Sequence, residues 1–238
     1  MELTYYGHAC FAVTFNNIRL LFDPFITHNP LEEAKKIDVN AIQADYILLS
    51  HGHADHSLDC MSIAQRTGAT VIGMVEITDF LDSQGLEAHG MNIGGQANFR
   101  NGSFTREKGD FKVKCVVAQH SSSMPVDNSY AGSPVGFLVT TDEASFYYSG
   151  DTGLTMDMQL IPRWAKLNFA VLPIGDNFTM GPEDALECAK MIECKTIVGV
   201  HYDTYAPLIQ IDKEWAKNVF NQAGYDLKLP KIGETITI

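Results

Sequence analysis

Short apolar runs alternate with polar segments along the chain, and this pattern predicts a succession of strands and helices. Residues 10 to 15 and 18 to 22 alternate as two strands. Asn16 and Asn17 between them tolerate the positive φ angles of a tight hairpin turn. Further strands are expected at residues 3 to 6, 46 to 49, 69 to 74, 111 to 119, 136 to 141, 145 to 149, 168 to 174, 196 to 200 and 234 to 238.

Helical spacing of apolar residues follows several of these strands. The expected helices cover residues 58 to 66 and 76 to 83, a segment that opens at Pro182, and residues 213 to 223. Asp212 is expected to cap the last helix, with Trp215, Val219 and Phe220 on its core face. Strands that alternate with helices favour helices packed outside a sheet. No Pro/Ser-rich or charged segment separates two halves, so one domain over residues 1 to 238 is expected.

Composition narrows the classes of partner. The formal net charge of −12 repels polyanions, which argues against a nucleic-acid substrate. No stretch approaches the roughly 18 consecutive apolar residues of a membrane span. The N-terminus lacks the basic and apolar regions of a signal peptide, so we expect a cytoplasmic protein without membrane contact. The five cysteines are scattered and odd in number, which favours buried, reduced thiols.

The strongest chemical signal lies directly after the apolar run of residues 46 to 49. His51, His53, Asp55 and His56 stand there within six positions. Imidazole and carboxylate are the ligands of divalent metals such as Zn²⁺ in catalytic sites. His51 and His53, two apart in an extended segment, project to one side and can hold one ion, and Asp55 and His56 can turn toward a second. The alternative is a polar surface loop in which histidines gather by chance, or histidines that make hydrogen bonds beside a site without binding metal themselves.

His-x-His-x-Asp-His after a strand resembles the metallo-β-lactamase superfamily. The superfamily implies three later ligands, each at the end of a strand, and the chain has His120, Asp151 within Gly150-Asp151-Thr152, and His201 at such positions. The resemblance implies an α/β (α+β) fold, a four-layer αβ/βα sandwich. It also implies two divalent metal ions. His51, His53 and His120 would hold the first metal and Asp55, His56 and His201 the second, with Asp151 between them.

Three further motifs are similar to the UPF0173 group of metal-dependent hydrolases, which is close to the ascorbate-6-phosphate lactonase branch. They are residues 7 to 11, residues 173 to 182 and residues 201 to 204. The metals are expected to be Zn²⁺, and the same ligands also accept Mn²⁺, Ni²⁺ or Fe²⁺.

Several residues near these motifs are candidates for supporting roles. In the superfamily the turn that holds His8 faces the site. His8 is therefore expected either to orient a ligand or to donate a proton to the leaving group. The alternative is that His8 caps its own turn. Asp23, at the end of its strand, either fixes the tautomer of a ligand histidine or caps a turn. Asp55 is expected to orient the attacking water. Asp176, Asn177 and Thr179 either contact substrate or cap the helix that opens at Pro182.

The expected function is a metal-dependent hydrolase with a dinuclear site. A hydroxide shared by the two metals would cleave an ester, lactone or phosphodiester bond of a small molecule. The alternative is a metal-binding sensor or scaffold with little turnover. A homo-oligomer is compatible with either function.

Overall fold

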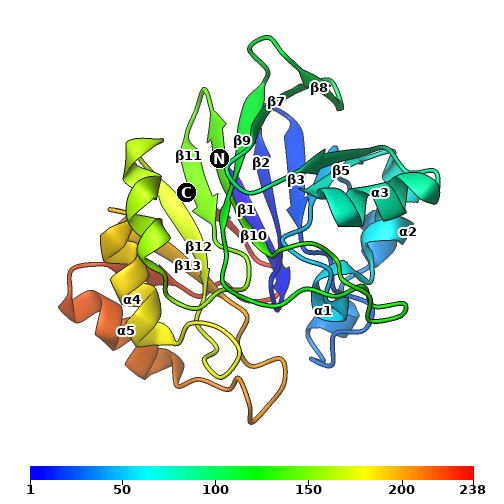
Figure 1. Ribbon diagram of the computed structural model, residues 1–238. Helices are drawn as coiled ribbons and strands as arrows, with labels where there is room; N and C mark the ends of the chain where they lie inside the picture. Colours follow the sequence, from blue (N-terminus) through cyan, green and yellow to red (C-terminus); the bar gives the residue numbers. More distant parts are fainter.

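Two β-sheets form the centre of the structure, which the computed structural model describes for residues 1–238 (Figure 1). The first sheet has seven strands in the order β15-β1-β2-β3-β4-β5-β6. Its strands are β1 Glu2–Gly7, β2 Cys10–Phe15, β3 Ile18–Phe22, β4 Tyr46–Leu48, β5 Thr70–Met74, β6 Ala88–Met91 and β15 Thr235–Thr237. The second half of this sheet, from β3 to β6, is parallel.

The second sheet has eight strands in the order β14-β13-β12-β11-β10-β9-β7-β8. Its strands are β7 Gln96–Arg100, β8 Ser103–Thr105, β9 Phe111–Val117, β10 Val135–Thr141, β11 Ser145–Tyr148, β12 Phe169–Pro173, β13 Thr196–Val200 and β14 Asp226–Lys228. Strands β11 to β14 are parallel to one another. Strand β9 runs in the same direction as β11, because both pair antiparallel with β10.

Helices cover the outer sides of the two sheets: α2 and α3 lie beside the first sheet, and α4 and α5 beside the second (Figure 1). The α-helices are α1 Ala54–Ser57, α2 Cys60–Thr67, α3 Val75–Ser83, α4 Pro182–Met191 and α5 Lys213–Gln222, and the 3₁₀ helices are Ala34–Lys36, Val39–Ala41 and Met156–Arg163. The sequence of layers is helix, sheet, sheet, helix. The four-layer αβ/βα sandwich is therefore confirmed.

One turn and two helix ends have the conformations that the sequence predicted. Asn16 and Asn17 adopt φ angles of 45° and 61° in the turn between β2 and β3. Gly68 ends α2 in the left-handed conformation. The Asp212 carboxylate accepts the backbone N–H groups of Glu214 and Trp215 at the start of α5.

The buried core consists of two clusters, because successive side chains of a strand point to opposite faces of the sheet. In β10, Phe137 and Val139 belong to a cluster of 44 buried residues that draws side chains from both sheets. Leu138 between them points to the other side and belongs to a cluster of 21 residues under α4 and α5. Alternate residues of a strand therefore pack on opposite faces of the sheet, one face toward the other sheet and one toward the helices.

Three details differ from the sequence-based expectations. Trp215 is 45% exposed and does not belong to the core, whereas Phe220 of the same helix is fully buried. A helix over residues 156 to 163 and the strand β14 were not expected, because Pro162 interrupts the first segment and the second has only three residues. No helix of the structure has the length and apolar character needed to cross a membrane.

Candidate metal centre

The seven expected ligands converge on one edge of the two sheets, which we call the ligand edge: the edge at which β3, β4, β9, β11 and β13 end. His51 and His53 follow β4, and Asp55 and His56 lie in the single turn of α1. The other three ligands follow β9, β11 and β13 and are His120, Asp151 and His201. Parallel strands end at the same edge, so the repeated strand-then-ligand pattern places these side chains together.

Six of the seven expected ligands fall into two groups of neighbouring ligand atoms, and a third group consists of Asp23, His51 and His56. His51, His53 and His120 form the first, with ligand atoms within 4.8 Å of one another. His8, Asp55, His56 and His201 form the second by the same measure. In the first group, Nε2 of His51 lies 2.9 Å from Nδ1 of His53.

Asp151 lies between the two groups. Its Oδ2 atom is 2.9 Å from Nε2 of His201, 3.2 Å from Nε2 of His56 and 3.8 Å from Nε2 of His120. One carboxylate oxygen thus approaches histidines of both groups. The resemblance to the superfamily implied a place between the two metals for Asp151.

Buried atoms without partners show that the site fits a cation. Nε2 of His56 and Oδ1 of Asp151 are buried and make no hydrogen bond. Burial raises the pKa of Asp151, but His201 and His56 hold it well below the usual range, so the carboxylate is ionised. Burial also lowers the pKa of His51, which keeps this imidazole neutral. Against the effect of its burial, Asp151 and Asp23 raise the pKa of His56, so a metal would displace a proton from this ring. Ionised carboxylate and neutral imidazole are the forms that bind a divalent metal.

Asp23 orients two of the histidines. Its carboxylate accepts hydrogen bonds from the Ser50 backbone N–H at 2.8 Å and from the Ser50 hydroxyl and Tyr148 hydroxyl, each at 2.5 Å. It also accepts from Nδ1 of His56 at 2.9 Å. A carboxylate only accepts, so Nδ1 of His56 carries a proton and Nε2 is directed to the site. The expected contact between Asp23 and a ligand histidine is present.

The same network fixes His51 through one intervening residue. The Ser50 hydroxyl donates its proton to Asp23, so it accepts the hydrogen bond from Nδ1 of His51 at 2.9 Å. Nε2 of His51 is therefore unprotonated, the form that binds a metal, and it lies beside Nδ1 of His53 in the first group. The sequence did not single out Ser50 or Tyr148. Ser50 stands directly before a ligand, which is a usable signal, whereas Tyr148 lies in another sheet and gave none.

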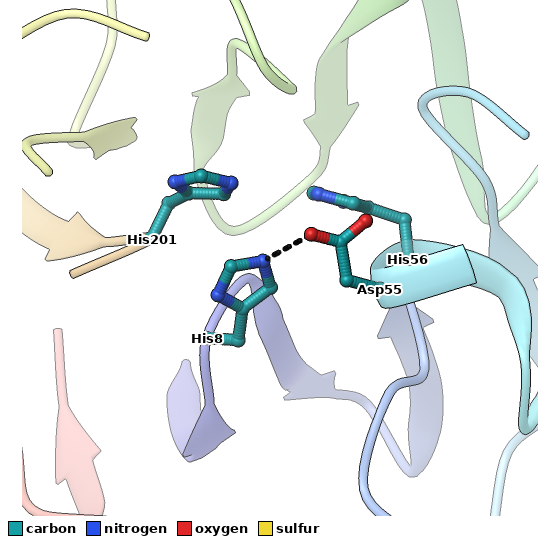
Figure 2. Close-up of side chains that lie close together, drawn as sticks. All are labelled: His8, Asp55, His56 and His201. Carbon is teal, nitrogen blue, oxygen red and sulfur yellow. Dashed lines mark hydrogen bonds and ion pairs between the residues drawn. The ribbon is translucent and has the colours of Figure 1, made fainter. Parts of the chain in front are cut away.

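His8 joins the second group from the turn between β1 and β2. It is fully buried, with a φ angle of 54°. Nε2 lies 3.2 Å from Oδ2 of Asp55, and Nδ1 lies 2.9 Å from the hydroxyl of Thr204 (Figure 2). Burial lowers the pKa of His8 to about 3, so the ring is neutral at pH 7. The ring therefore donates Nε2–H to Asp55 and accepts from Thr204, and it does not cap its own turn.

Asp176, Asn177 and Thr179 lie on the loop after β12. Asp176 and Asn177 are exposed, with φ angles of 61° and 52°. Oδ1 of Asp176 accepts the backbone N–H of Asn177, so this side chain bonds within its own loop. Helix α4 begins after Gly181 without a side-chain cap, so the capping alternative is wrong. The loop adjoins the site through the Met180 N–H, which donates to the Thr152 carbonyl at 3.0 Å.

Gly52 and the loop over residues 118 to 134 close one side of the site. A Cβ at Gly52 would lie 2.7 Å from Cβ of Ala131 and 2.8 Å from the carbonyl oxygen of Ser123. The Gly52 N–H also donates to the Ser122 hydroxyl at 3.1 Å. Only glycine permits this approach of the two loops.

Known proteins resemble this chain over its full length. Residues 18–202 match the family described as "Beta-lactamase superfamily domain". A "UPF0173 metal-dependent hydrolase" of Christiangramia forsetii is 48% identical over 238 residues, and one of Flavobacterium johnsoniae is 44% identical; both matches cover all of each chain. The solved structure of Igni18, described as a novel metallo hydrolase from Ignicoccus hospitalis, is 32% identical with a TM-score of 0.85. That match covers 99% of this chain and 97% of the other.

Proposed function

The chain belongs to the beta-lactamase superfamily and, within it, to the UPF0173 metal-dependent hydrolases, and from this premise we propose that it cleaves an ester, lactone or phosphodiester bond of a small molecule at a dinuclear site. One observation carries the proposal: two groups of ligand atoms flank a single buried carboxylate, Asp151. A site for one ion would not need both groups.

We assign the metals to the two groups. His51, His53 and His120 would hold one, and Asp55, His56 and His201 the other, with Asp151 shared. When bound, the two divalent cations, Zn²⁺ in the first place, supply Lewis acidity and lower the pKa of a water molecule between them. Imidazole and carboxylate ligands also suit Mn²⁺, Ni²⁺ and Fe²⁺.

The residues around the metals would prepare the site. Asp23 holds Nε2 of His56 toward it directly and Nε2 of His51 through Ser50. Asp55, 26% exposed, can accept a hydrogen bond from an attacking water and orient it. His8 fixes the Asp55 carboxylate from below with its Nε2–H (Figure 2). These contacts support a positioning role for His8, and its action as proton donor to the leaving group stays a prediction.

We propose further that residues 1 to 238 form one domain, because one core cluster draws side chains from both sheets. The substrate would be a small molecule rather than a nucleic acid, given the net charge of −12. Asp176, Asn177 and Thr179 remain candidates for contacting it. We also propose that the protein acts in the cytoplasm.

Metal analysis combined with hydrolysis assays tests the proposal. We expect about two equivalents of metal in protein purified without chelator, and hydrolysis of an ester, lactone or phosphodiester after loading with Zn²⁺ or Mn²⁺. His51→Ala and Asp151→Ala variants should each lose metal and more than about 99% of kcat/KM. His28→Ala is the matched control, because His28 is exposed and belongs to neither group. Less than half an equivalent of metal and no activity with any loaded metal would contradict the proposal.

A further inference from the structure

The segments at the ligand edge carry no Lys or Arg, although the chain has 17 such residues. This holds for every segment that bears or directly adjoins a ligand candidate: residues 7 to 10, 23 to 34, 49 to 59, 118 to 134, 149 to 156, 174 to 182 and 201 to 212. The same segments contain ten carboxylates: Asp23, Glu32, Glu33, Asp55, Asp59, Asp127, Asp151, Asp176, Asp203 and Asp212.

Lys35 and Lys213 stand directly beside two of these segments, and each pairs with a carboxylate of its neighbouring segment. Nζ of Lys35 lies 2.5 Å from Oε1 of Glu32. Lys213 follows the last segment, and its Nζ lies 2.8 Å from Oδ2 of Asp203 and 5.3 Å from the centre of the Tyr202 ring.

Exposed apolar side chains are frequent on the segments that lack Lys and Arg. The exposed ones on the same segments are Leu58 at 42%, Val126 at 75%, Tyr130 at 68%, Met156 at 67%, Phe178 at 48% and Leu208 at 58%. They account for half of the large hydrophobic side chains that the molecule exposes. Single exposed apolar residues need no explanation, but their gathering on the loops of one site does.

Contacts place these loops beside the ligands. Leu58 ends the turn that carries Asp55 and His56, and its N–H donates to the Ala54 carbonyl at 3.2 Å. The Leu208 N–H donates to Tyr205, whose ring lies 5.6 Å from that of His8. Tyr130 pairs with Ser123 in the loop that packs on Gly52. The loops extend beyond the ends of both sheets, where the green, yellow and orange segments lie in Figure 1.

We propose that the substrate is a carboxylic ester or lactone whose groups around the scissile bond are uncharged and apolar. This inference rests on the proposed function and narrows its three bond types to two. The transition state of phosphoryl transfer spreads negative charge over three equatorial oxygens, which enzymes commonly meet with Arg or Lys in addition to metals. Attack on a carbonyl group develops one oxyanion, which needs fewer positive partners. An anionic tail would meet ten carboxylates within these segments, and the two lysines beside them are already paired with Asp203 and Glu32.

The reaction balances as a simple hydrolysis. The oxygen of a water molecule bonds to the carbonyl carbon, and the bond from that carbon to the alkoxy oxygen breaks. The products are a carboxylate and an alcohol, which stay joined as a hydroxy acid when the substrate is a lactone. One proton of the water goes to the alcohol oxygen and the other to solvent.

A matched pair of esters tests the inference on the metal-loaded protein. 4-Nitrophenyl butyrate has an uncharged acyl chain, and 4-nitrophenyl hemisuccinate has a carboxylate at the end of a similar chain. We expect kcat/KM for the butyrate to exceed that for the hemisuccinate by at least about tenfold after correction for their rates in buffer. We also expect it to exceed that for bis(4-nitrophenyl) phosphate.

Charge added at the edge should shift this preference. Phe178→Lys and Leu208→Lys should each raise kcat/KM for the hemisuccinate relative to the butyrate by about fivefold or more. Phe104→Lys is the matched control, because Phe104 is 46% exposed but lies on β8, away from the ligand-bearing segments. It should leave the ratio unchanged.

The outcomes distinguish failure of this inference from failure of the proposed function. Equal or faster turnover of the hemisuccinate or of the phosphodiester overturns this inference and leaves the dinuclear hydrolase standing. Absence of turnover for all three compounds and for γ-lactones, in protein that holds two equivalents of metal, overturns both. A lysine variant that leaves the ratio unchanged removes the apolar edge as the cause of the preference and overturns the inference.

Discussion

Among single residues, Asp23 controls the largest part of the ligand geometry. One buried carboxylate receives donors from Ser50, Tyr148 and His56, and it adopts a φ angle of 41° that asparagine also tolerates. The tautomer of His56 depends on this carboxylate directly, and that of His51 depends on it through the Ser50 hydroxyl. A change of one oxygen to an amide nitrogen tests this role with little change of shape.

We expect Asp23→Asn to weaken metal binding by about 10- to 100-fold, because residues that orient metal ligands have effects of this size. The Asn NH₂ group would face donors instead of accepting from them, which should also lower the free energy of unfolding by about 1–3 kcal/mol. Competition titration with a chromophoric chelator measures the affinity, and urea unfolding measures the stability.

Asp45→Asn is the control for this change. Asp45 is exposed, and its carboxylate accepts one backbone N–H, from Arg19, at 2.8 Å. Its variant should retain wild-type metal affinity. If the Asp23 and Asp45 variants bind metal equally well, Asp23 does not orient the histidines.

At the scale of elements, the ends of neighbouring strands must approach closely to bring the ligands together. Gly175 follows β12 and faces the residue that follows β13. A Cβ at this position would overlap the carbonyl oxygen of His201 and lie 3.1 Å from Cβ of Ile209. The overlapping atom of His201 belongs to the backbone, which cannot rotate away as a side chain can.

We therefore expect Gly175→Ala to displace His201, to lower the free energy of unfolding by about 1–3 kcal/mol and to reduce the metal content. The paired control is Gly153→Ala, because a Cβ at Gly153 meets no atom within 4 Å. That variant should stay within about 0.5 kcal/mol of the parent protein. Chemical unfolding and metal analysis of both proteins provide the measurement, and equal stability of the two variants would contradict the close approach.

Helix α5 illustrates what an element's own pattern leaves undetermined. Its apolar residues Trp215, Val219 and Phe220 have helical spacing, and all three were expected in the core. Phe220 is buried, but Trp215 is 45% exposed at the first turn of the helix. The period shows which face is apolar, whereas the distance between the helix end and the sheet decides how far along that face the burial extends.

For the whole molecule, the proposed metals would connect the two sheets. In each ligand group some residues follow strands of the first sheet and others follow strands of the second: His51 and His53 meet His120, and Asp55 and His56 meet His201. Without cations, the approach of these groups leaves buried polar atoms without partners. The metals should therefore stabilise the packing of the sheets against each other.

Removal of metal should lower the stability of the whole protein. A ligand that binds only the folded state at a free concentration 1,000 times its Kd contributes about 4 kcal/mol per site. We expect the thermal midpoint to fall by several degrees on treatment with a chelator and to recover on addition of Zn²⁺, as measured by circular dichroism. Mg²⁺ in place of Zn²⁺ is the control, since a site rich in imidazole favours Zn²⁺. An unchanged midpoint would exclude a link between the sheets through metal.

The sequence by itself determined most of the strands and helices and, through its resemblance to a known superfamily, the fold class and the seven residues that converge. His51, His53, Asp55 and His56 form one local motif after an apolar run, and the resemblance implied His120, Asp151 and His201 at the ends of later strands. The tertiary structure decided which residues hold these ligands in place. Tyr148 and Asp23 lie 125 positions apart and Thr204 and His8 lie 196 apart. Such pairs form only when the two sheets pack, and no periodicity along the chain encodes that contact.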